Sequence, residues 1–247
     1  MTLPSPGPDR TAVVTGASSG IGAEIARDLS ARGHHVTLVA RSVDKLEALA
    51  SELSAGADVV PADLADRAAR AALAERLLGG PRTVEILVNN AGYSTLGPVH
   101  ASDPEDEMAM IEVDVVAVAD LTSRLLPAMV ARGRGAVLNV ASTAAFQPLP
   151  GQAGYGAGKA FVLSYTQSLA GELRGTGVTA TALCPGPVDT GFGERAGFSK
   201  ADAEEALPAI MWVSAADVAR QGVAHQQVGH DALSLGRREV GQPWDAL

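Results

Sequence analysis

Short apolar segments alternate along this chain with longer segments of helical periodicity. Six of the apolar segments are rich in valine, isoleucine and leucine and have the length of ordinary strands. Continuous apolar runs of this kind are typical of strands that are buried on both faces, as in a parallel sheet. The predicted strands are residues 11–15, 36–40, 58–61, 84–88, 136–140 and 178–183.

The segments between these strands are alanine-rich and long enough to be helices that cross from one parallel strand to the next. The order predicts an α/β protein of Rossmann type, a doubly wound three-layer sandwich whose mainly parallel sheet has six to seven strands. No internal repeat or linker divides the chain, so we expect one domain over residues 1–247, with a loose segment at 1–9. The predicted helices are residues 20–32, 43–53, 65–78, 104–131 and 154–173.

The pattern becomes less regular after Val188. Residues 189–212 mix glycine, phenylalanine and charged side chains, and we expect them to form a lid over a substrate. Ser214 and Asp217 then have the spacing of a capping box, which predicts another helix, although aspartate replaces the usual glutamate or glutamine. A weak pattern at 238–240 suggests a closing strand.

Composition excludes several classes of protein. The chain carries 19 lysines and arginines against 28 aspartates and glutamates, and its net charge of −9 argues against a nucleic-acid-binding surface. The single cysteine, Cys184, cannot form an internal disulfide, and the five histidines lack metal-binding spacing, so no metal is expected. No signal sequence and no apolar run of about 18 residues is present, which predicts a cytoplasmic protein without a membrane span.

The first predicted strand runs directly into the sequence TGASSGIG at residues 15–22, and a predicted helix follows. Gly16, Gly20 and Gly22 would let the backbone turn tightly and approach a pyrophosphate at the N-terminus of that helix. This spacing differs from the usual dinucleotide fingerprint but meets the same requirement. A tight turn that binds no ligand is the alternative interpretation.

The second predicted strand ends in Ala40 and Arg41, about twenty residues beyond the glycine turn. A carboxylate at this place would bind the ribose 2′-hydroxyl of NAD. No acid is present here, whereas the planar guanidinium of Arg41 can hold a 2′-phosphate through two hydrogen bonds. The sequence therefore favours NADP(H), unless Arg41 is an ordinary exposed residue at a helix start.

Two further strands end in polar residues that could face the same ligand. Asp63 and Leu64 follow the third strand, and Asn89, Asn90, Ala91 and Gly92 follow the fourth. In open α/β sheets ligands bind at this carboxyl edge, where an acid can accept a hydrogen bond from an adenine amino group. Helix capping by Asp63 and turn closure by the asparagines are the alternatives.

A candidate proton-transfer group lies after the fifth strand. Ser142 ends that strand, and Tyr155 and Lys159 are four residues apart, so they share one face of a helix. A neighbouring ammonium favours the phenolate, which suits a tyrosine that exchanges a proton with a carbonyl or an alcohol. Taken alone, the pair could equally be an ordinary helix pair with a surface lysine.

The order of these motifs over about residues 11–190 resembles the short-chain dehydrogenase/reductase family in its single-domain form. The resemblance implies that Tyr155 is the general acid/base, that Lys159 assists it and binds the nicotinamide ribose, and that Ser142 orients the substrate carbonyl. The cofactor-binding residues that it implies are Gly16, Ser18, Ser19, Gly20, Ile21, Arg41, Asp63, Leu64, Asn90, Ala91, Gly92, Tyr155, Lys159, Pro185, Gly186, Val188 and Thr190.

Asp114 departs from the family pattern, which usually has asparagine at this position as part of a proton relay to the lysine. An ionised aspartate has nearly the same shape, but it only accepts hydrogen bonds and carries charge. Our hypothesis is that Asp114 supports the same relay and draws part of the field of Lys159 away from Tyr155. Local neutralisation of Asp114, with little effect on the reaction, is the alternative.

The resemblance also indicates substrates and partners. Apolar side chains fall in the segments that it places around the substrate, which suggests an apolar carbonyl or alcohol. Family members assemble through helices that correspond to 104–131 and 154–173, so a homodimer or homotetramer is expected. Two other functions stay open: an NADP(H)-binding redox sensor of the same fold, and a nucleotide-binding methyltransferase. The apolar residues are Tyr93, Phe146, Leu149, Phe192, Phe198, Met211 and Trp212.

Overall fold

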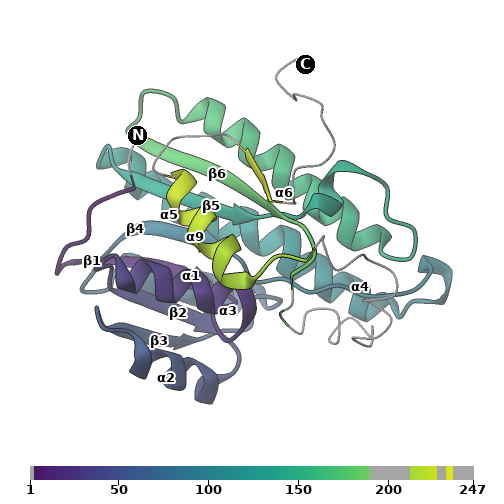
Figure 1. Ribbon diagram of the computed structural model, residues 1–247, viewed down its shortest axis with the longest axis horizontal. Helices are drawn as coiled ribbons and strands as arrows, with labels where there is room; N and C mark the ends of the chain where they lie inside the picture. The colour runs from purple at the N-terminus through teal and green to yellow at the C-terminus, as the bar shows by residue number, and fades with distance from the viewer. Residues whose placement is uncertain (1–2, 189, 191–211, 227–231, 236–247) are drawn as a thin grey trace.

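A seven-stranded sheet forms the centre of the computed structural model, which describes residues 3–188, 190, 212–226 and 232–235. Every neighbouring pair of strands is parallel, and the order across the sheet is β3-β2-β1-β4-β5-β6-β7. Helices cover both faces (Figure 1), so the expected Rossmann-type three-layer fold is confirmed. The strands are β1 (Arg10–Thr15), β2 (Val36–Ala40), β3 (Ala57–Pro61), β4 (Thr83–Asn89), β5 (Gly135–Val140), β6 (Val178–Pro185) and β7 (Ala232–Leu235).

Alternate residues of the strands divide the core into two layers. On β1, Ala12 and Val14 pack with helices α1, α2 and α9, while Val13 packs on the opposite face with α3, α5 and α6. This alternation follows from the two-residue period of a strand, and both faces are apolar because both are covered. The main helices are α1 (Gly20–Ala31), α2 (Val43–Glu52), α3 (Arg67–Leu78), α4 (Pro104–Ile111), α5 (Ala117–Ala131), α6 (Ala153–Glu172) and α9 (Ala215–Gln226).

The strand order reverses at β1, which lies between β2 and β4. Ala12 of β1 pairs with Val36 on one side and with Ile86 on the other. The connections that follow β1 and β4 leave the sheet in opposite directions, which opens a crevice at the carboxyl ends of these strands. The glycine turn after β1 and the Asn90 segment after β4 therefore meet at this crevice.

The predicted helix at 104–131 is interrupted by one wider turn. A π-helical turn, η2 (Glu112–Val116), joins α4 to α5 without a break in the chain direction. Asp114 lies in the middle of this turn and is buried. Such turns are rare in proteins, and those that occur are often at functional sites. The apolar periodicity of the sequence did not predict this turn.

The ends of the chain refine several expectations. Ser214 Oγ accepts a hydrogen bond from Asp217 N at 3.0 Å, which confirms the predicted helix start before α9. The seventh strand is β7, whereas the strand predicted at 238–240 and nearly all of the predicted lid lie outside the described residues. At the other end, Leu3 is buried against the core and Arg10 Nη1 donates to Ser5 O at 2.9 Å.

Candidate active site

The glycine turn after β1 is built from backbone that only glycine adopts readily. Gly16 and Gly20 have φ angles of +65° and +57°, in the left-handed region. A Cβ on Gly16 would lie 2.7 Å from the Cα of Ala91, and a Cβ on Gly20 would lie 2.9 Å from the Cβ of Thr190. The turn is therefore enclosed by the segments that follow β4 and β6.

Hydrogen bonds from Asn90 and Thr15 hold this turn against β4. Asn90 Nδ2 donates to Thr15 O at 2.9 Å and to Gly16 O at 3.3 Å. Thr15 Oγ1 accepts from the backbone N–H groups of Asn90 and Ala91 at 3.0 and 3.1 Å. Sequence reasoning identified Asn90 but missed Thr15, whose signal was a hydroxyl at the last position of an apolar strand.

The helix that follows the turn suits a bound phosphate. Ser19 is the N-cap of α1, and the first turn of the helix carries no acidic side chain. The N–H groups and the positive end of the helix dipole therefore face the turn without a competing carboxylate. Together with the two left-handed glycines, this arrangement fits the pyrophosphate of a dinucleotide.

We expect Gly16→Ala to lower the free energy of unfolding by about 2–5 kcal/mol. A left-handed alanine costs about 1–2 kcal/mol, and crowding against Ala91 adds about 1–3 kcal/mol. Gly151→Ala is the matched control, because Gly151 has a φ of +84° but no atom within 4 Å of its Cβ position. Urea unfolding of both variants checks this; equal losses would show that the close contact with Ala91 has no energetic weight.

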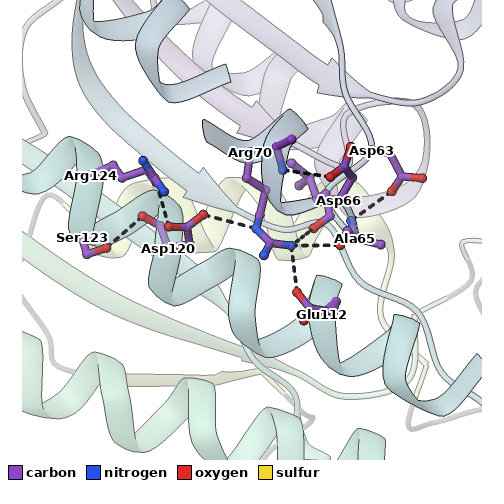
Figure 2. Close-up of polar contacts among 10 residues, drawn as sticks. Asp63, Ala65, Asp66, Arg70, Glu112, Asp120, Ser123 and Arg124 are labelled. Carbon is purple, nitrogen blue, oxygen red and sulfur yellow. Dashed lines mark hydrogen bonds and ion pairs between the residues drawn. The ribbon is translucent and has the colours of Figure 1, made fainter. Parts of the chain in front are cut away.

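Arg41 and Asp63 lie at the ends of β2 and β3, and both are exposed. Asp63 Oδ1 accepts a hydrogen bond from Ala65 N at 3.0 Å (Figure 2). The N-cap of α3 is Asp66, which accepts from Ala68 N at 2.8 Å, so Asp63 does not cap that helix. Leu64, which lies between Asp63 and Asp66 in the sequence, is buried and thereby fixes the course of the loop.

Tyr155, Lys159 and Asp114 meet at the other side of the crevice. Lys159 Nζ lies 3.0 Å from Asp114 Oδ2 and 5.5 Å from the centre of the Tyr155 ring. It also donates to Val140 O at 3.2 Å, at the carboxyl end of β5. The structure thus brings together three of the predicted catalytic residues, and Lys159 is not a surface lysine.

Asp114 reaches Lys159 because its surroundings leave room for a carboxylate. A Cβ on Gly92 would lie 2.9 Å from Asp114 Oδ2, and a Cβ on Gly158 would lie 3.2 Å from Val115 Cγ2. The backbone N–H of Tyr93 donates to Asp114 Oδ1 at 3.0 Å. The role of Gly158, which brings α6 close to η2, was missed by sequence reasoning.

Asp114 and Lys159 form a buried ion pair, with exposed side-chain fractions of 1% and 6%. Burial raises the pKa of Asp114, although the Lys159 ammonium acts in the opposite direction. Burial alone would lower the pKa of Lys159, but the charge and hydrogen bond of Asp114, together with the nearby Tyr155, outweigh burial and the pKa is raised. The ammonium therefore keeps its proton, and Asp114 is its counter-ion.

Ser142 lies where β5 ends and the short helix η3 (Thr143–Phe146) begins. Its Oγ accepts a hydrogen bond from Ala144 N at 3.1 Å, which fixes the side chain at the carboxyl edge of the sheet. Cys184 is buried nearby, and burial raises the pKa of its thiol to about 12. The thiol thus stays protonated and unreactive, as is usual for a cysteine in an apolar interior.

Asn89, which sequence reasoning left as a possible turn residue, belongs to a buried row of polar side chains. Asn89 Nδ2 donates to Asn139 Oδ1 at 2.8 Å and to Thr122 Oγ1 at 3.0 Å. Asn139 Nδ2 in turn donates to Thr166 Oγ1 at 2.9 Å. The row connects β4 and β5 to α5 and to α6, which carries Tyr155 and Lys159.

The segment after β6 completes the crevice as far as it is described. Val188 pairs with Val213, and Val213 N donates to Pro187 O at 3.0 Å. Pro185 and Gly186 precede this contact, so the predicted nicotinamide-side residues lie at the same edge as Thr190. Of the apolar substrate-side residues, Phe192, Phe198 and Met211 fall outside the described residues.

Tyr93 is partly buried, and its backbone N–H bonds the Asp114 carboxylate. Burial raises its pKa, the charges of Asp114, Asp106 and Asp63 add to this effect, and Arg41 opposes it. Tyr93 therefore stays a neutral hydroxyl.

Among the described residues, no group of three or more histidine, cysteine, aspartate or glutamate side chains is placed to hold a metal ion. Within the same part of the chain, none of the helices has the length and apolarity needed to span a membrane.

Known proteins share both the sequence pattern and the fold. A family model for short chain dehydrogenase matches residues 10–199. An uncharacterized oxidoreductase of Staphylococcus epidermidis is 35% identical over 210 residues, covering 83% of this chain and 90% of that protein. An NADP-dependent 3-hydroxy acid dehydrogenase of Salmonella typhimurium is 40% identical over 180 residues, 71% of each chain. The solved structure of a short-chain dehydrogenase from Sphingobium yanoikuyae in complex with NADPH has a TM-score of 0.84 and 32% identity, covering 91% of this chain and 87% of that one.

Proposed function

The chain belongs to the short-chain dehydrogenase/reductase family, and on this premise we propose that it is an NADP(H)-dependent oxidoreductase that interconverts a ketone or aldehyde with its alcohol. The observation that carries the proposal is the contact of Lys159 with both Tyr155 and Asp114, beside a glycine turn that fits a pyrophosphate. This arrangement supports a proton-transfer group and a dinucleotide site at one edge of the sheet. NADP(H), when bound, would supply the hydride for reduction and accept it in oxidation.

In this proposal the side chains handle the proton and the orientation of the substrate. Tyr155 gives its phenol proton to the carbonyl oxygen during reduction and takes a proton from the alcohol during oxidation. The Lys159 ammonium favours the phenolate that is left, because an opposite charge nearby stabilises it. Ser142, held at the end of β5, orients the same oxygen.

The preference for NADP(H) rests on the end of β2 and on the relatives. Arg41 is exposed there, and the next residue is Ser42 instead of an acid. A carboxylate would repel a 2′-phosphate, whereas a guanidinium binds it with charge-assisted hydrogen bonds. Both the dehydrogenase of Salmonella typhimurium and the structure from Sphingobium yanoikuyae are described with this form of the cofactor.

Replacing Arg41 by alanine should raise the Kd of NADPH about 10- to 100-fold and leave the Kd of NADH nearly unchanged. Only NADPH has the 2′-phosphate that the guanidinium would hold. Calorimetric titration with both cofactors measures the change. Arg174→Ala is the control, since it removes the same charge from an exposed position beyond α6. Equal weakening of both cofactors would contradict the assignment of Arg41.

We propose an apolar carbonyl or alcohol as the substrate class, because the segments that the family resemblance assigns to the substrate carry apolar side chains such as Tyr93, Phe146 and Leu149. A panel of ketones and aldehydes with NADPH tests turnover directly. Tight NADPH binding without turnover of any carbonyl would instead support the redox sensor. Failure to bind either nicotinamide cofactor would overturn the proposal as a whole.

We also propose that the chain forms a homodimer or homotetramer through α4, α5 and α6. Met108 of α4 and Phe161 of α6 are large apolar side chains that are 55% and 39% exposed. Phe161 stacks on Tyr165 with a ring-centre distance of 5.6 Å, which makes a flat apolar surface on α6. Sedimentation equilibrium measures the assembly, and a monomer at high concentration would contradict this proposal.

A further inference from the structure

Arg70 of α3 is a charged side chain that is almost wholly buried outside the catalytic cluster. Only 2% of its side chain is exposed, although no charge is needed at this place by the reaction proposed above. Figure 2 shows its guanidinium between the loop that follows β3 and the helix that contains η2 and α5. A buried arginine needs several partners to offset its lost hydration, so its contacts indicate what it holds.

On one side, the guanidinium holds the loop after β3. Arg70 Nη1 donates to Leu64 O at 2.6 Å and to Ala65 O at 3.2 Å. Two successive carbonyls are thus turned inward, toward α3. The carbonyl positions fix the peptide planes of this loop, and Asp63 and Leu64 are the residues expected to face the adenine.

On the other side, the same guanidinium holds two carboxylates of the neighbouring helix. Arg70 Nη1 lies 2.9 Å from Glu112 Oε2, and Arg70 Nε donates to Asp120 Oδ2 at 3.2 Å. Asp120 Oδ1 accepts a further hydrogen bond from Arg124 Nε at 2.7 Å. The loop is thereby connected to the helix that also carries Asp114.

We propose that Arg70 is a positioning residue for the adenosine end of NADP(H). Its role is indirect. Arg70 sets the course of the loop after β3 by bonding Leu64 O and Ala65 O. The carboxylates of Glu112 and Asp120 hold the Arg70 guanidinium in place. The inference rests on the proposed function, because it assumes that the loop receives the adenosine. Without the guanidinium, the Leu64 carbonyl loses its donor and the two carboxylates lose their shared cation.

The experiment compares the whole cofactor with its two halves. Calorimetric titration of the full chain with NADPH, with adenosine 2′,5′-bisphosphate and with reduced nicotinamide mononucleotide is carried out on the parent and on Arg70→Met. We expect the variant to raise the Kd of NADPH and of adenosine 2′,5′-bisphosphate by about tenfold or more. The Kd of the nicotinamide half should stay as in the parent.

Two further variants separate positioning from general stability. Arg124→Met is the matched control, since Arg124 bonds the other oxygen of Asp120 and is 35% exposed. It should leave all three Kd values unchanged. Arg70→Lys should restore part of the affinity, because one ammonium can bond a loop carbonyl but cannot span both carbonyls and both carboxylates.

A structural role alone would give a different pattern. If Arg70→Met lowered the melting temperature but its folded form bound adenosine 2′,5′-bisphosphate as tightly as the parent, the inference would be overturned. If Arg70→Met did not fold, Arg70→Lys would decide the question. Kd values of Arg70→Lys equal to those of the parent, for NADPH and for adenosine 2′,5′-bisphosphate, would also overturn the inference. Failure of the parent itself to bind NADPH would instead overturn the proposed function, so the two failures are distinguishable.

Discussion

Replacement of Tyr155 by phenylalanine is expected to lower kcat for carbonyl reduction by about 100- to 10,000-fold, the usual contribution of a positioned acid or base. The ring keeps its place near Lys159 Nζ, which lies 5.5 Å from its centre, but the phenol proton is lost. NADPH binding should stay close to that of the parent, since the phenyl ring remains and the glycine turn proposed to hold the pyrophosphate is unchanged. Steady-state kinetics with a carbonyl substrate and calorimetry with NADPH measure the two effects.

Tyr165→Phe is the matched control on the same helix. Tyr165 lies ten residues further along α6 and stacks on Phe161. Burial and the charge of Glu172 raise the pKa of its phenol, and its ring packs against the apolar core. We expect kcat to be unchanged in this variant. A parent-like rate in Tyr155→Phe would remove Tyr155 from the proposed mechanism.

Replacement of Asp114 by asparagine should move the pH–rate profile for alcohol oxidation to lower pH by about one unit or more, the usual size of a close charge effect. The Asp114 carboxylate, 3.0 Å from Lys159 Nζ, offsets part of the positive field that Tyr155 experiences. Asparagine keeps the shape and the acceptor for the Tyr93 N–H but has no charge. The stronger field then favours the phenolate, so oxidation reaches its half-maximal rate at lower pH.

The profile has two outcomes that would contradict this hypothesis. Superimposable curves would mean that Asp114 does not affect the field at Tyr155. A move to higher pH would mean that Lys159, whose pKa Asp114 raises, loses its charge when the carboxylate is removed. Asp28→Asn is the control, because Asp28 of α1 pairs with Arg32 at the end of that helix, 2.7 Å away and outside the catalytic cluster.

Much of the fold followed from the sequence because buried parallel strands have a simple pattern. β2 has the predicted bounds, and the other strands through β6 begin or end within one or two residues of the prediction. The side chains of these strands are apolar on both faces of the sheet. This pattern is typical of strands that are covered by helices on both faces. The glycine turn and the Tyr155–Lys159 spacing were equally clear, since each depends on local geometry alone.

The contacts that tune the site were not predictable in the same way. Asp114 was expected to matter, but its approach to Lys159 depends on the π-helical turn and on Gly158, which a helical pattern does not reveal. Arg70 has the sequence context of an exposed helix residue. Its burial depends on partners near residues 64 and 120. The partner at residue 120 is distant along the sequence, and only the packing of the folded chain brings it to Arg70.

The position of β1 between β2 and β4 also affects the order in which the chain can fold. Thr11 pairs with Val84, so one edge of β1 lacks its partner until β4 has been synthesised. At about 5–20 residues per second, translation leaves that edge open for roughly 4–15 s. A helical hairpin would have no such interval, because its contacts are local. During synthesis, β1 therefore has an unpaired edge, and an exposed strand edge can pair with another chain and lead to aggregation. The nascent protein depends most on protection from aggregation in this interval.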